Sequence, residues 1–181
     1  MQLLFFLTVQ AALSVALSIP GGLNKRKAET NATLLAYGLN SSAWPIAYGL
    51  SDGNLYITQN PDDYSANLAP VTWDLPSITG ENWIVNATFA NGTSAGSLYL
   101  RPESSNAVGL LPMTYITRIN GTVSGFALFA TQLVYNNNTY LEAQFWAEPT
   151  KTSGVYSLVW NSDGMAAVAE SYPVVIKGVE S

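Results

Sequence analysis

The sequence predicts an all-β protein, a single domain built either as an antiparallel β-sandwich of jelly-roll type or as a barrel. Aromatic residues make up 12% of the 181 residues, and such a content favours strands over helices. From about residue 34 onward, short apolar runs alternate with turn residues, and no stretch keeps a helical apolar stripe for three turns. The spacing of these runs is typical of a sandwich or a barrel.

Eight apolar runs are predicted as strands because turn residues separate them. They cover 54–59, 82–90, 97–101, 112–119, 123–135, 139–147, 154–160 and 165–176, the last with a break near 171–173. In 82–90 a glycan on Asn86 would hold that face outward, so the apolar residues at the odd positions from 83 to 89 would face the core. Asn91-Gly92, directly after this run, is typical of a tight hairpin turn.

The first eighteen residues form an apolar run that is typical of a secretory signal peptide. Small residues stand at Ala16 and Ser18, the positions that a signal peptidase reads before it cuts. A membrane anchor is the alternative, but the run is short and Pro20-Gly21-Gly22 follows it closely. We therefore predict a signal peptide over 1–18, processed after Ser18, and no membrane span in the mature chain.

A short pro-segment over 19–26 is predicted next, because it ends in a dibasic pair, Lys25-Arg26, that is similar to a kexin-type processing site. The alternative is a flexible tail with three exposed basic residues, Lys25 to Lys27. We favour cleavage after Arg26, since a Gly- and Pro-containing segment is open to a protease. The remaining β-rich domain would then span 27–181.

Six Asn-X-Ser/Thr sequons indicate a glycosylated, eukaryotic, secreted protein. Their acceptor residues are Asn31, Asn40, Asn86, Asn91, Asn120 and Asn137. The chain has no cysteine, so a secreted domain of this length must be held by its hydrophobic core alone.

Composition also excludes several kinds of chemistry. The formal net charge is −5, and three of the seven basic residues stand together at 25–27, so we expect no binding to nucleic acid. Histidine and cysteine are both absent, which removes the usual nucleophilic triads and the usual zinc and copper ligands. We predict no metal site, no cofactor and no catalytic residue.

Paired carboxylates are the one catalytic arrangement left open, because a glycosidase needs only two. Glu142 and Glu148 are six residues apart, and on one straight strand they would be separated by about 20 Å. Catalytic carboxyl groups lie about 5 to 9.5 Å apart, so a partner would have to come from another strand. A secreted carboxylate-dependent glycosidase or lyase therefore stays as an alternative function.

A carbohydrate-binding module is the other alternative, and it rests on the run VYNNNTYLEAQFWA at 134–147. Tyr and Trp rings stack on the apolar faces of sugars, while polar neighbours bond to the hydroxyl groups. If 139–147 is one strand, its core side is formed by Leu141, Ala143, Phe145 and Ala147. The opposite side, which we call the stripe, consists of Tyr140, Glu142, Gln144 and Trp146.

The whole arrangement, with its signal peptide, Lys25-Arg26 site, cysteine-free β-rich body and six sequons, resembles small secreted surface proteins of filamentous fungi, including those of conidial cell walls. That resemblance implies a non-enzymatic role at the cell surface: covering wall components, or modulating recognition by a host as a secreted virulence factor. The expected partners are cell-wall polysaccharide or host surface molecules. The expected location is extracellular or wall-associated.

Overall fold

The computed structural model describes residues 28–39, 42–80, 82–101, 106–112, 121–136, 140–161 and 168–180. Nearly all of the regular structure in these ranges is antiparallel strand, which confirms the predicted all-β class. A one-turn 3-10 helix, η1 (Tyr64–Ala66), is capped by Asp63, whose carboxylate accepts bonds from the backbone N–H groups of Ser65 and Ala66. No helix in the described ranges has the length and hydropathy needed to cross a membrane.

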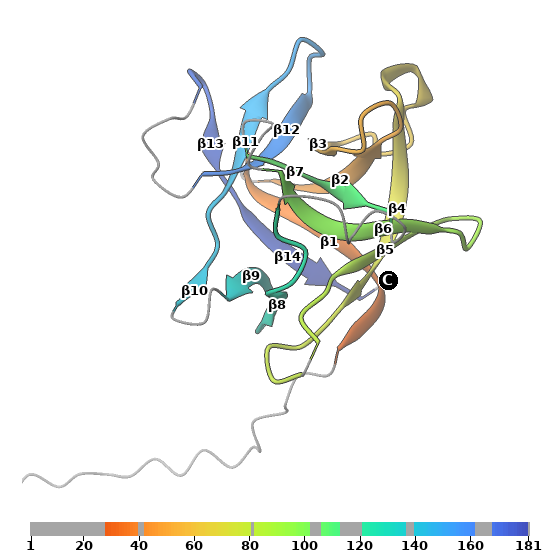
Figure 1. Ribbon diagram of the computed structural model, residues 1–181. Helices are drawn as coiled ribbons and strands as arrows, with labels where there is room; N and C mark the ends of the chain where they lie inside the picture. Colours follow the sequence, from red (N-terminus) through yellow and green to blue (C-terminus); the bar gives the residue numbers. More distant parts are fainter. Residues whose placement is uncertain are drawn as a thin grey trace, which may run out of the picture.

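The strands follow one another closely along the chain (Figure 1). They are β1 (Glu29–Leu39), β2 (Ser42–Gly49), β3 (Leu55–Thr58), β4 (Leu68–Leu75), β5 (Asn86–Phe89), β6 (Ser94–Arg101), β7 (Ala107–Leu111), β8 (Phe126–Phe129), β9 (Gln132–Asn136), β10 (Leu141–Glu142), β11 (Phe145–Pro149), β12 (Val155–Trp160), β13 (Tyr172–Pro173) and β14 (Val175–Val179).

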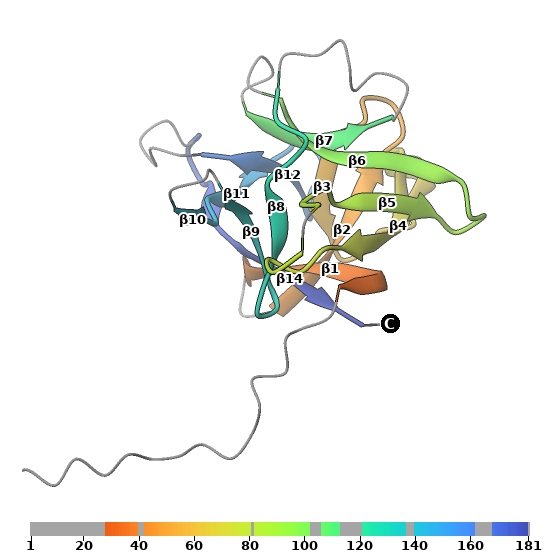
Figure 2. The ribbon, with the colours of Figure 1, turned by 60° about the horizontal axis from the view of Figure 1, so that its bottom comes forward.

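Pairing closes a ring of strands in the order β2, β4, β5, β6, β7, β12, β3 and back to β2. Figure 2 shows β4, β5, β6 and β7 side by side in that order. β6 and β7 are aligned over five residue pairs, whereas β7 meets β12 through the single pair Ala107 and Val159. The arrangement is therefore barrel-like, with one narrow joint.

A second group of strands lies against this ring and is reached through β1. The middle of β1 pairs with β14, from Thr33 opposite Val179 to Tyr37 opposite Val175. The stretch of β1 from Leu35 to Leu39 also pairs with β2, and Glu29 and Ala32 pair with β4. β14 continues to β9 through Lys177 and Gln132, and β9 pairs with both β8 and β10.

One hydrophobic core is enclosed by these strands. Along β1 the apolar residues alternate, so Ala32, Leu34 and Ala36 are buried, as the two-residue period of a strand requires. Trp73 and Phe145 are among the largest fully buried side chains, and burial of each such side chain is worth about 1.5 to 3 kcal/mol. In the absence of disulfides this burial is the main source of stability.

Several predicted strands are confirmed within a few residues, notably 54–59 as β3 and 154–160 as β12. Four strands were not predicted: β1, β2, β4 and β7. Pro45 and Pro70 interrupt the apolar pattern of β2 and β4, since proline is rare inside strands. In the structure they pair in register opposite Leu35 and Ala47.

Two predicted runs were wrong as single strands. The run 123–135 is a hairpin of β8 and β9, with a turn at Ala130, whose φ is +58°. The run 139–147 divides into β10, which pairs with β9, and β11, which pairs with β12 and β13. The last run, 165–176, contains the short β13 and then β14, which continues to Val179.

The remaining expectations concern 82–90 and 112–119. Val85 and Ala87 are buried as predicted, while Trp83 and Phe89 are only half-buried, and the strand begins at Asn86. The expected turn at Asn91-Gly92 is present, and Gly92 has a φ of +81°. In 112–119 only Pro112, which follows β7, lies within the described residues.

Candidate functional site

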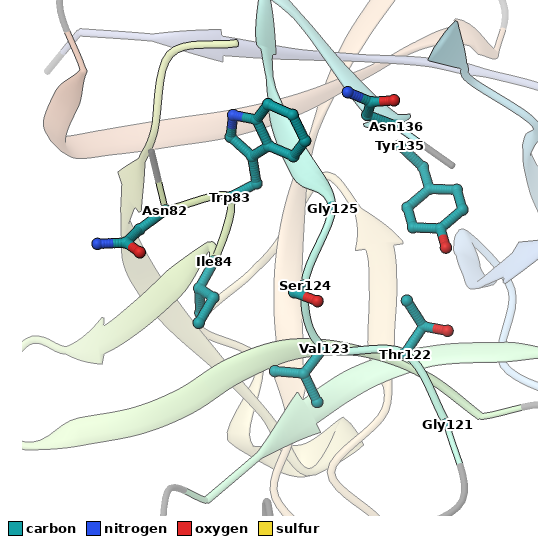
Figure 3. A pocket seen from close by; sticks show the side chains of 10 residues that line it. All are labelled: Asn82, Trp83, Ile84, Gly121, Thr122, Val123, Ser124, Gly125, Tyr135 and Asn136. Atoms are coloured by element: carbon teal, nitrogen blue, oxygen red, sulfur yellow. The ribbon is translucent and has the colours of Figure 1, made fainter. Parts of the chain in front are cut away.

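A hollow of about 520 Å³ opens where three segments of the chain meet (Figure 3). The segments come from the loop before β5, the stretch that leads into β8, and the end of β9. The lining residues are Asn82, Trp83, Ile84, Gly121, Thr122, Val123, Ser124, Gly125, Tyr135 and Asn136. We call this the hollow. Its volume lies within the range of about 300 to 1,000 Å³ that is typical of small-ligand sites.

Backbone hydrogen bonds join the three segments at Gly125. The N–H of Gly125 donates to the carbonyl of Trp83 at 2.8 Å, and the N–H of Phe126 donates to the same carbonyl at 3.1 Å. The carbonyl of Gly125 accepts a bond of 2.8 Å from the N–H of Asn136. Gly125 therefore joins the backbone at Trp83 to the backbone at the end of β9, where Tyr135 precedes Asn136.

Two glycines allow this close approach. Gly125 has a φ of +103°, and a Cβ built on it would lie 2.6 Å from Cε2 of Tyr135. At Gly121 a Cβ would collide with the ring of the buried Tyr99. Any other residue at either position would displace a ring or the backbone, so the shape of the hollow depends on glycine.

The ring of Tyr135 is held by neighbouring aromatic rings. Its centroid lies 5.2 Å from that of Phe126 and 5.8 Å from that of Trp160, the latter in an edge-to-face contact with an interplanar angle of 83°. Trp160 also meets Phe145 edge-to-face at 4.9 Å, within the core. Tyr135 is half-buried, so part of its surface remains available in the hollow.

Trp83 presents hydrocarbon to the hollow. The side chain is half-buried, but its Nε1 is fully buried and has no hydrogen-bond partner in the described structure. Nε1 is the only polar atom of an indole, so the accessible surface of the Trp83 side chain is carbon. Ile84, which is 38% exposed, adds a second apolar surface beside it.

The polar residues of the hollow that the structure describes are uncharged. Asn82 and Ser124 are exposed, and Thr122 and Asn136 are half-buried. None of the ten lining residues is Asp, Glu, Lys or Arg. The hollow therefore offers rings, hydroxyl groups and amides, which suit a neutral ligand that has both apolar faces and hydroxyl groups.

The stripe, in contrast, is divided between two strands. Tyr140 precedes β10 and is 69% exposed, and Glu142 ends β10, whereas Trp146 belongs to β11. Gln144 lies between the two strands, and its buried Oε1 has no partner in the described structure. These four residues do not share one continuous strand face, because β10 and β11 pair in different sheets.

The side of this run that was expected to face the core is only partly buried. Phe145 is 1% exposed and Ala147 is fully buried, as expected. Leu141 is 45% exposed and Ala143 is half-buried, because the chain leaves one sheet and enters the other between β10 and β11.

Three of the predicted glycosylation sites are described. Asn31 and Asn91 are exposed, and Asn91 lies at the turn between β5 and β6. Asn86 is half-buried, and its Oδ1 accepts a 2.7 Å hydrogen bond from the buried hydroxyl of Ser97. The other predicted sites, Asn40, Asn120 and Asn137, and the processing residues Ser18, Lys25 and Arg26 lie outside the described residues.

No carboxylate of the described residues lines the hollow or either of two others, which we describe next. The second hollow, of about 450 Å³, lies beside Tyr56 and Lys151, and the third, of about 240 Å³, is lined largely by apolar residues such as Pro45 and Val71. No group of three or more Asp and Glu residues within the described ranges could hold a metal ion. Glu142 and Glu148 lie on different strands, so the expected separation along one straight strand does not apply.

The carboxylate of Asp52 has a structural partner. Its Oδ2 accepts a 2.6 Å bond from the hydroxyl of Tyr56 and a 3.0 Å bond from Nδ2 of Asn54. Burial, followed by this hydrogen bond to Asp52, raises the pKa of Tyr56 to about 12. This pair stabilises the turn before β3.

Sequence reasoning did not identify the hollow. The sequence pattern places Trp83 on the core face and Tyr135 inside a long strand, because each pattern extends only over neighbouring residues. One local signal was available, namely the glycines that flank Thr122, Val123 and Ser124, since glycines around small polar residues indicate a close backbone approach. No protein-family model, curated protein or solved structure matches this chain.

Proposed function

We propose that the protein is a non-catalytic, secreted glycoprotein of a fungal cell surface or wall, where it covers wall components or modulates recognition by a host. The signal-peptide pattern at 1–18, the dibasic pair at 25–26 and the six sequons support secretion and glycosylation. The fungal origin rests on the resemblance to small cysteine-free surface proteins.

The exposed position of Asn91 in a hairpin turn is the observation on which the proposal mainly rests. This residue is exposed at the turn between β5 and β6, next to Gly92, around which a Cβ would meet nothing within 4 Å. Its Oδ1 accepts bonds from the backbone N–H of Thr93 at 3.0 Å and from the Thr93 hydroxyl at 2.6 Å. Both bonds engage Oδ1, and neither engages the amide nitrogen, the atom to which an N-glycan would be attached.

Mass spectrometry of the full chain secreted from a fungal host tests the glycosylation. We expect the intact mass to fall when N-glycans are removed enzymatically, and Asn91→Gln to lack one glycan. Asn60→Gln is the matched control, because Asn60 is also exposed but is followed by proline and belongs to no sequon. A secreted wild-type protein without N-glycans would contradict the proposal.

Localisation in the source organism tests the cell-surface role. We expect immunogold labelling on the wall, and we expect deletion of the protein to increase the binding of labelled lectins to wall polysaccharide. An unchanged wall together with a protein found only in the medium would refute this role.

A carbohydrate-binding module is the second candidate, and the observation that favours it is the uncharged hollow with two aromatic rings. A carboxylate-dependent glycosidase has no comparable support, because the lining of the three hollows described above includes no carboxylate.

A further inference from the structure

We propose that the hollow binds a neutral saccharide, with Trp83 and Tyr135 contacting its apolar faces and Ser124, Thr122 and the two asparagines facing its hydroxyl groups. This inference rests on the proposed cell-surface role, in which wall polysaccharide surrounds the protein. It places the binding site away from the stripe at Tyr140 to Trp146.

The two aromatic residues carry the first part of the argument. A pyranose ring has C–H groups on its faces, and these pack on aromatic carbon. Trp83 offers only carbon, because its Nε1 is buried, and Ile84, whose side chain points the opposite way in Figure 3, is a second apolar residue of the lining. Figure 3 shows Trp83 and Ile84 on one side of the segment 121–125 and Tyr135 on the other. Apolar side chains therefore stand on both sides of the segment that lines the hollow.

The polar lining gives the class of ligand. Ser124 and Thr122 can each donate and accept a hydrogen bond, and the asparagine amides can do both as well. Among the ten described lining residues, a phosphate, carboxylate or amine would lose hydration and find no partner of opposite charge. Neutral sugars with many hydroxyl groups fit this lining best.

The hollow is also preorganised. Gly125 bonds to both Trp83 and Asn136, and Tyr135 is packed against Phe126 and Trp160. A ligand would therefore not need to order the Tyr135 ring or the backbone at Trp83 and Asn136, and binding avoids that entropic cost.

Saccharides of this class can come from two sources, the polysaccharides of a wall or the N-glycans of glycoproteins. The test uses isothermal titration calorimetry on the full secreted chain after enzymatic removal of its own N-glycans. One arm uses laminarihexaose and chitohexaose, which represent wall glucan and chitin. The other arm uses a free high-mannose N-glycan. We expect saturable binding in at least one arm, and the arm identifies the source.

Ser124→Arg is the decisive variant, because Ser124 is exposed and the long side chain would fill the hollow without removing a core contact. We expect it to weaken binding at least about tenfold. Ser153→Arg is the matched control, since Ser153 is an exposed turn serine outside the hollow, and it should bind like the wild type. Trp83→Ala should lose affinity while Trp83→Phe recovers part of it, with circular dichroism used to check folding.

Three results would overturn the inference. They are no binding in either arm, wild-type affinity in Ser124→Arg, or loss of binding in a folded Trp146→Ala variant that Ser124→Arg does not reproduce. The last would place the site on the stripe. A wall-located protein that binds no saccharide would refute the inference alone, and a saccharide-binding protein found only in the medium would refute the proposed function alone.

Discussion

The hollow and the stripe contain the same kinds of residue, but the chain builds them differently. The stripe is a pattern within one short run of sequence, and the structure divides it between β10 and β11. The hollow has no pattern in sequence, because its residues come from three segments that meet at Gly125. Convergence in space, and not spacing in sequence, brings the aromatic and polar residues together here.

The largest change in stability is expected from a residue of the same run that faces the core, opposite the stripe. Phe145→Ala removes a ring that is 1% exposed and packs on Trp160 at 4.9 Å, so we expect a loss of about 3 to 5 kcal/mol in the free energy of unfolding. Tyr140→Ala, at 69% exposure, should change it by less than about 0.5 kcal/mol. Urea unfolding followed by tryptophan fluorescence measures both. Equal losses in the two variants would mean that Tyr140 is packed.

The next effect tests the construction of the hollow. Gly125→Ala places a Cβ against Tyr135 at a φ of +103°, and we expect it to cost about 2 to 4 kcal/mol through steric overlap and backbone strain. Gly92→Ala is the control, because it has a positive φ but no atom near its Cβ, and it should cost about 1 kcal/mol. Thermal unfolding compares them. If both variants lose the same stability, the contact with Tyr135 does not constrain the hollow.

A smaller effect is expected at Tyr56, which lies outside both the hollow and the stripe and whose ionisation changes stability at alkaline pH. The pKa of Tyr56 is raised from 10.0 to about 12 in the folded protein, so its protonated form contributes stability that is fully present below pH 10. That contribution is lost as the pH rises from 10 to about 12. Tyr56→Phe should lower stability by about 1 kcal/mol at pH 7 and show a smaller further loss over this window. A wild type and variant with parallel profiles would disprove the role of the Asp52 bond.

The smallest expected effect is that of salt concentration on the affinity for the saccharide. If the neutral hollow binds the saccharide, affinity should change by less than about twofold between about 50 and 500 mM NaCl, because screening acts on charged partners. Calorimetric titration at the two concentrations measures this. A strong dependence would point instead to a charged residue, such as Glu142 of the stripe.

The sequence predicts the class of the fold well and the site poorly. Regular apolar spacing in 54–59 and 154–160 identifies β3 and β12, since each residue there reports on its own face of a strand. Pro45 and Pro70 prevent the prediction of β2 and β4 from sequence. A strand accepts a proline only where its neighbouring strands permit it, and the local pattern does not contain those neighbours. Trp83 and Tyr135 are far apart in sequence and come together only in the folded chain. The spacing of apolar residues within either run therefore does not predict the hollow.

The pairing of β1 with β14 has a consequence for how the protein is made. Thr33 lies opposite Val179, so the first described strand finds this neighbour only after all the residues between the two have left the ribosome. Contacts between such distant segments slow folding, because a long loop must close before they form. The two ends of the described structure therefore come together late, and the sheet that contains β1 and β14 is completed only then.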